Sequence, residues 1–101
     1  MSGKDLPEEG LPEKANKKKK NWLVYIILCS DDSLYTGITT DLKRRFKQHK
    51  NKTGAKYFYG RDPLEIVFTE PGHDRSSASY REYEIKSYSR AKKIVLIKSE
   101  Q

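Results

Sequence analysis

The stretch that decides the fold is Trp22-Leu23-Val24-Tyr25-Ile26-Ile27-Leu28-Cys29. It is an unbroken apolar run, rich in β-branched and aromatic residues, which is typical of a central strand covered on both faces. The polar residues 30–33 that follow read as a turn. Leu34-Tyr35-Thr36-Gly37-Ile38 then predicts a second strand, so the two segments are expected to form a hairpin.

Beyond the hairpin the sequence predicts one more strand and three helices. The helices are expected at 41 to about 51, at 74 or 76 to about 88 and at 90 to about 98, and the third strand at 64–69, where Pro71-Gly72 breaks it. Thr39 or Thr40 is the expected cap of the first helix, and Ser89 can cap the last. The predicted class is α/β, a three-stranded antiparallel-type sheet with three helices in the order β-β-α-β-α-α.

Charge divides the chain into a tail and a folded domain. Residues 1–21 carry six lysines and four acids with few apolar side chains, which predicts a disordered basic tail. Residues 22–98 are the expected domain and 99–101 a short end. Residues 22–101 hold fifteen Lys or Arg against ten acids, a net +5 of the total +7, which favours a polyanionic partner such as nucleic acid.

The longest apolar run, eight residues, is far shorter than the roughly 20 that a membrane-spanning helix needs. No signal peptide is evident, and the single cysteine, Cys29, cannot form an internal disulfide. We therefore expect a cytoplasmic protein without a membrane partner.

The first predicted helix places two polar residues near its apolar stripe. On a wheel of about 100° per residue, Leu42 and Phe46 mark the buried side. Arg45 and His49, four residues apart, lie at its flank, where an arginine must be paired or must face a cleft. A lone histidine there could also be a hydrogen-bonded boundary residue. The pairing with Arg45 favours a site.

The second predicted helix repeats this pattern. Ala78 and Ile85 mark its buried side, Glu82 lies on the same arc, and Glu84 points away. One interpretation is a carboxylate directed into the same cleft as Arg45, where Mg²⁺ or Mn²⁺ could bind. The other is an ordinary surface pair between Glu82 and Lys86.

The hairpin adds Tyr25 and Tyr35, with Gly37 two residues further on. A glycine inside a strand often marks a close approach by backbone or ligand. If Cys29 paired directly with Leu34 across an even loop, the two tyrosines would lie on opposite faces of the sheet. A shared site therefore requires an odd loop or a bulge within residues 30–34, which we predict.

These positions together resemble the GIY-YIG nuclease family over residues 22 to about 98. The two signature elements correspond to Leu23-Val24-Tyr25 and Tyr35-Thr36-Gly37, and the helix-borne residues to Arg45, His49 and Glu82. The chain is most similar to small stand-alone bacterial members, which share the 34–41 stretch and the Gly54-Ala55-Lys56 loop. It departs from the family at Leu23, where a glycine is usual, and at Ile94, where many members carry Asn.

The resemblance implies a metal-dependent endonuclease that hydrolyses DNA phosphodiester bonds, with a role in DNA repair or recombination. The implied catalytic residues are Tyr25, Tyr35, Arg45, His49 and Glu82, with Glu82 holding Mg²⁺ or Mn²⁺. In these roles Tyr25 deprotonates water, Tyr35 and His49 orient it or relay its proton, and Arg45 stabilises the phosphate.

Flanking cations are expected to contact DNA, branched or single-stranded, and they are Lys43, Arg44, Lys47, Lys56, Arg61 and Lys86. The aromatic residues 57–59 could stack on bases or pack in the core. Two alternatives stay open, a non-catalytic nucleic-acid-binding module on the same scaffold and a protein-interaction subunit.

Overall fold

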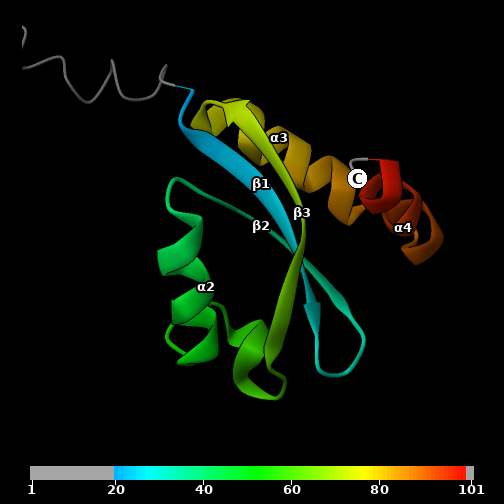
Figure 1. The fold of residues 1–101 in the computed structure, drawn as a ribbon. Coiled ribbons are helices and arrows are strands. Elements are labelled where there is room, and N and C mark those ends of the chain that lie inside the picture. The colour runs from blue at the N-terminus through cyan, green and yellow to red at the C-terminus, as the bar shows by residue number, and fades with distance from the viewer. Residues whose placement is uncertain (1–19, 100–101) are drawn as a thin grey trace, which may run out of the picture.

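The computed structural model describes residues 20–99 of the chain (Figure 1). Most of the tail predicted at 1–21 lies outside the described residues, as do residues 100–101. Ser99, predicted to lie beyond the domain, is the last residue of the final helix. No helix in the part of the chain that the structure describes is long and apolar enough to cross a membrane.

The apolar run quoted first forms the middle strand of a three-stranded sheet. β1 (Trp22–Cys29) pairs antiparallel with β2 (Leu34–Thr39) on one side and with β3 (Pro63–His73) on the other, giving the order β2-β1-β3. Its residues 24–27 are at most 1% exposed. Burial on both faces explains why the run is continuously apolar rather than alternating.

Helices cover both faces of this sheet (Figure 1). They are α2 (Leu42–Lys50), the short 3₁₀ helix η1 (Lys56–Tyr59), α3 (Arg75–Lys86) and α4 (Arg90–Ser99). α3 and α4 pack against Val24, Ile26 and Phe68, whereas α2 and η1 pack against the face that carries Tyr25 and Ile27. The observed order confirms the predicted α/β fold class.

The helix starts follow from local side-chain capping. Asp41 caps α2 by accepting a hydrogen bond from the backbone N–H of Arg44 at 3.1 Å, so the prediction of Thr39 or Thr40 as the cap was wrong. Thr39 Oγ1 instead accepts from the backbone N–H of Asp41 at 3.0 Å. Asp74 caps α3, one of the two predicted residues, and Ser89 Oγ accepts from the Lys92 N–H at the start of α4.

The third strand is longer than predicted, because β3 continues through Pro71 and Gly72 to His73. β3 is an edge strand with a neighbouring strand on one side only. A proline, which has no N–H, is tolerated in such a strand because the N–H that it lacks can be one that would point away from the sheet. Gly72 has φ +85°, and the register with β1 shifts nearby, between Trp22 and Val24. The expected break is therefore an irregularity within one strand. The short helix η1, in the segment predicted as loop, was also missed.

The β1–β2 hairpin has the odd loop that a shared tyrosine site requires. Cys29 donates its N–H to the carbonyl of Ser33 at 2.9 Å, which leaves residues 30–32 as a three-residue loop. Asp32 takes a left-handed conformation there, with φ 69°. Tyr25 consequently pairs with Gly37 and Ile27 with Tyr35, so both tyrosines lie on the same face of the sheet.

Candidate active site

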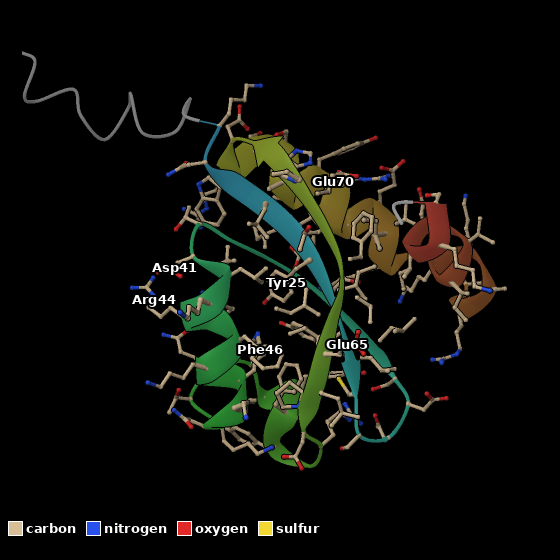
Figure 2. The ribbon with its side chains drawn as sticks, in the orientation of Figure 1. Tyr25, Asp41, Arg44, Phe46, Glu65 and Glu70 are labelled. Atoms are coloured by element: carbon tan, nitrogen blue, oxygen red, sulfur yellow. The ribbon has the colours of Figure 1, made fainter. Side chains whose placement is uncertain are left out.

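A cleft of about 360 Å³ opens between α2, α3 and the hairpin. Its lining comes from β1, β2, α2, the loop before η1, and α3, and consists of Tyr25, Tyr35, Gly37, Ile38, Arg45, His49, Gly54, Ala55 and Glu82. The five side chains that the sequence predicted as catalytic all border this one cleft. Figure 2 shows Tyr25 between β1 and α2, with Phe46 directed from α2 toward the sheet and Arg44 directed outward.

Tyr25 and His49 form the buried base of the cleft. The Tyr25 Oη lies 2.9 Å from the His49 Nε2, and both residues are 1% exposed. Gly37 faces Tyr25 across the strand pair, and a Cβ at position 37 would lie only 2.5 Å from that Oη. Gly37 is therefore needed to admit the phenol. A close approach at this glycine was expected from backbone or ligand, and in the structure it is made by a side chain of the neighbouring strand.

Aromatic rings hold His49 in place. Its ring centroid lies 4.3 Å from that of Phe58 and 5.3 Å from that of Tyr35, and Tyr35 in turn packs against Tyr57 at 5.0 Å. Phe58 is fully buried, so of the two interpretations for this residue the core packing is correct. Tyr57 is partly buried, and Tyr59 is 65% exposed. Edge-to-face and tilted contacts of this kind fix ring orientation.

Gly54 is a cleft residue that sequence reasoning missed. A Cβ at this position would lie 2.6 Å from His49 Nδ1, so the loop backbone lies directly against the imidazole. That Nδ1 atom is buried and has no hydrogen-bond partner in the described structure. The only sequence signal was the Gly54-Ala55-Lys56 similarity to small family members, which said nothing of this contact.

Burial sets the protonation of the three ring side chains. Burial, reinforced by Tyr35 and Glu82 and opposed by Arg45, raises the pKa of Tyr25 well above its ordinary value. Burial and Glu82 also raise the pKa of Tyr35. Burial, followed by the charge of Arg45, lowers the pKa of His49 to about 4. At neutral pH the two phenols and the imidazole are therefore uncharged.

Glu82 shows both features that the sequence left as alternatives, since it faces the cleft and also pairs with Lys86. Its side chain is 23% exposed and lines the cleft, while its Oε2 also lies 3.1 Å from the Nζ of the more exposed Lys86. Within residues 20–99 no group of three or more His, Cys, Asp or Glu is placed to hold a metal ion. One carboxylate, completed by phosphate oxygens and water, nevertheless suits Mg²⁺, which commonly binds through few protein ligands.

The predicted DNA-contacting cations differ in availability. Those with exposed side chains are Lys43, Arg44, Lys47, Lys56 and Lys86. Arg61 is engaged within the fold: its guanidinium lies 4.0 Å from the Tyr57 ring centroid, donates Nη1–H to the Tyr57 carbonyl and pairs with Asp31 at 2.8 Å. Arg61 thus stabilises the position of η1, and of the six candidate cations it is the least available for contact with DNA.

Comparison with known proteins gives one consistent family. A model of the "GIY-YIG catalytic domain" matches residues 21–94. The chain is similar to the UPF0213 protein of Haloquadratum walsbyi, with 56% identity over 70 residues, covering 69% of this chain and 79% of that protein. It is also 49% identical over 75 residues to the UPF0213 protein of Staphylococcus aureus, covering 74% of this chain and 92% of that protein.

Two solved structures share the fold. The UPF0213 protein of Bacillus halodurans is 45% identical, with a TM-score of 0.50, and the match covers 76% of this chain and 82% of that one. A protein of E. faecalis is 36% identical, with a TM-score of 0.57, over 82% and 88% of the two chains. Since the family match spans most of the chain and the relatives align over most of their own length, this chain belongs to the GIY-YIG nuclease family.

Proposed function

We propose that this protein is a metal-dependent endonuclease that hydrolyses phosphodiester bonds in DNA, an activity suited to repair or recombination. The observation that carries the proposal is the convergence of Tyr25, Tyr35, Arg45, His49 and Glu82 on one cleft. These residues come from four different elements, β1, β2, α2 and α3, and span much of the domain in sequence. A guanidinium, a carboxylate and a hydrogen-bonded phenol–imidazole pair can supply phosphate binding, a metal ligand and a proton acceptor, three functions that serve phosphodiester hydrolysis.

Arg45 is the proposed phosphate-binding residue. Its planar guanidinium can donate two hydrogen bonds to phosphate oxygens and stabilise the charge that grows on them. Glu82 is the proposed ligand of Mg²⁺ or Mn²⁺, sharing the ion with water and phosphate oxygens. The bound ion would polarise the scissile phosphate and stabilise the charge on the leaving oxygen.

Tyr25 and His49 are the proposed proton acceptors. Because its pKa is raised, Tyr25 is a neutral phenol, and it can accept a proton from water only if it gives up its own. His49 Nε2, at 2.9 Å, is placed to take that phenolic proton. The water proton moves to Tyr25 Oη and the phenolic proton moves to His49 Nε2. The hydroxide attacks phosphorus as the bond from phosphorus to one sugar oxygen breaks, and that oxygen leaves with the other end of the strand and takes a proton from solvent. Tyr35 borders the same space and is proposed to orient the water.

The test is cleavage of end-labelled branched and single-stranded DNA by the full chain with Mn²⁺ or Mg²⁺. Glu82→Gln is expected to lose about 100-fold or more in rate, because loss of the metal ligand removes several kcal/mol of transition-state stabilisation. Glu84→Gln is the matched control, since Glu84 lies on the same helix but pairs with Arg81 outside the cleft. Equal rates for wild type and Glu82→Gln would refute the proposal.

A non-catalytic nucleic-acid-binding module is the second candidate. The observations that favour it are the raised pKa of Tyr25 and the position of Ile94, where many family members carry Asn. Ile94 is partly buried in α4 and does not line the cleft. This candidate predicts DNA binding that Glu82→Gln leaves unchanged, with no metal-dependent cutting by any variant.

A further inference from the structure

α3 exposes two tyrosines to solvent. Tyr80 is 71% and Tyr83 is 76% exposed, the two highest values among the large hydrophobic residues of the described chain. Neither takes part in a hydrophobic cluster or an aromatic pair within residues 20–99. Tyr88, two residues beyond the end of α3, by contrast packs against the core, accepts a hydrogen bond from Arg81 and lies under Lys92. Among residues 20–99, therefore, no side chain packs on the rings of Tyr80 and Tyr83.

Helix geometry connects these rings to the cleft. Glu82 lines the cleft, and Lys86, one turn further along, pairs with it at the rim. Tyr83 lies about 100° around the helix from Glu82, and Tyr80 about 60° further in the same direction. Tyr83 is also three residues from both Tyr80 and Lys86, the spacing at which side chains on a helix are neighbours. A path leaving the cleft thus crosses a cation and then two exposed rings.

The charge and the aromatic character of the surface formed by Lys86, Tyr83 and Tyr80 indicate which kind of ligand it can bind. The described part of the chain is basic, and Lys86 stands between the cleft and Tyr83. A positive rim followed by exposed aromatic rings is the arrangement that binds unpaired nucleic acid, with phosphates on the cation and bases stacked on the rings. Bases in a duplex are already stacked on each other and leave no face free for a tyrosine.

We propose that Tyr83, continued by Tyr80, is a base-stacking subsite for an unpaired strand that leaves the cleft over Lys86. The inference rests on the proposed function, because it takes the strand in the cleft to be DNA. It adds a substrate class: DNA with an unpaired segment next to the phosphate that enters the cleft. It also separates two kinds of contact, since Lys86 binds any backbone whereas the rings bind only accessible bases.

The experiment measures binding of fluorescent oligo(dT) and of a blunt-ended linear duplex to the full chain by anisotropy, with EDTA present so that no strand is cut. Tyr83→Ala is expected to weaken oligo(dT) binding about 5- to 100-fold and duplex binding less than about twofold. Tyr83→Phe keeps the ring and should stay near wild type. Tyr80→Ala should show a smaller loss of the same kind. Val95→Ala is the control for loss of an exposed apolar side chain, because Val95 is 67% exposed on α4 and does not line the cleft.

The outcomes separate this inference from the proposed function. A protein that cuts DNA while Tyr83→Ala binds oligo(dT) like wild type overturns the stacking subsite and leaves the nuclease proposal standing. A protein that never cuts, yet binds oligo(dT) through Tyr83, keeps the subsite and removes the nuclease. Equal losses for oligo(dT) and duplex, or equal losses in Val95→Ala and Tyr83→Ala, also overturn it. A surface used by a protein partner predicts no change in any DNA affinity, which has the same consequence.

Discussion

Gly37→Ala is expected to destabilise the domain by forcing Tyr25 away from His49. The added Cβ would lie 2.5 Å from the Tyr25 Oη and 2.6 Å from Cζ, well inside the ~3.5–4.0 Å of a favourable contact. The ring is 1% exposed and its hydroxyl is bonded to His49, so any movement away from the new methyl group disturbs that hydrogen bond and the packing around the ring. Relief therefore requires movement of the ring or of β2.

The magnitude follows from three contributions. Overpacking a well-filled site costs about 1–3 kcal/mol. Loss of the Tyr25–His49 hydrogen bond adds about 1 kcal/mol. Replacing a strand glycine by alanine returns about 0.5–1 kcal/mol. The net cost is about 2 kcal/mol, which in a domain of this size lowers the melting temperature by about 10 °C.

Urea unfolding followed by circular dichroism measures this cost, with two controls. Gly60→Ala places a methyl where no atom lies within 4 Å and should be neutral or slightly stabilising. In a Tyr25→Leu background the phenol is gone, so the penalty of Gly37→Ala should shrink by more than about 1 kcal/mol. A Gly37→Ala protein as stable as wild type, or an unchanged penalty without the phenol, would show that the close approach is not what requires glycine.

Three further stability predictions use the same unfolding assay. Burial and Arg45 lower the pKa of His49 in the folded state to about 4, so its contribution to the free energy of unfolding is complete above pH 6.5 and is lost as the pH falls toward 4. Between pH 7.5 and 4.5 the wild type should therefore lose roughly 2 kcal/mol more stability than His49→Leu. Parallel pH profiles of the two proteins would contradict this. Thr36→Val removes a buried hydroxyl that has no partner in the described structure, and should be neutral or stabilise by up to about 1 kcal/mol. Thr39→Val removes the acceptor of the Asp41 N–H and should cost about 1 kcal/mol; equal effects of the two valine variants would argue against this distinction.

The sequence was sufficient wherever a local pattern carried the information. The apolar run at 22–29 predicted the central strand, because a short continuous run rich in β-branched and aromatic residues suits a strand that is covered on both faces. The position of Arg45 and His49 beside the apolar stripe of α2 predicted that both turn inward, and they do. Requiring Tyr25 and Tyr35 to share a face predicted the odd hairpin loop.

The missed features depend on contacts between segments distant in sequence. Pro71 does not end β3 because β3 is an edge strand, and the position of β3 in the sheet follows from which strands pair with β1. Gly54 matters because α2 brings His49 against it, and helical spacing within α2 cannot show that. The cap of α2 was misassigned because Thr39 and Asp41 are both good capping residues, and only the bend after β2 selects Asp41.

The most direct measurement of the central claim is the position of Mn²⁺ on the protein, read from paramagnetic broadening of backbone amide NMR signals. Broadening should centre on the cleft residues Tyr25, Arg45, His49 and Glu82, vanish in Glu82→Gln and persist in Glu84→Gln. Broadening centred elsewhere, for example on Asp31 and Asp32 of the hairpin loop, or a pattern that Glu82→Gln leaves intact, would contradict a single metal-and-phosphate site built by these side chains.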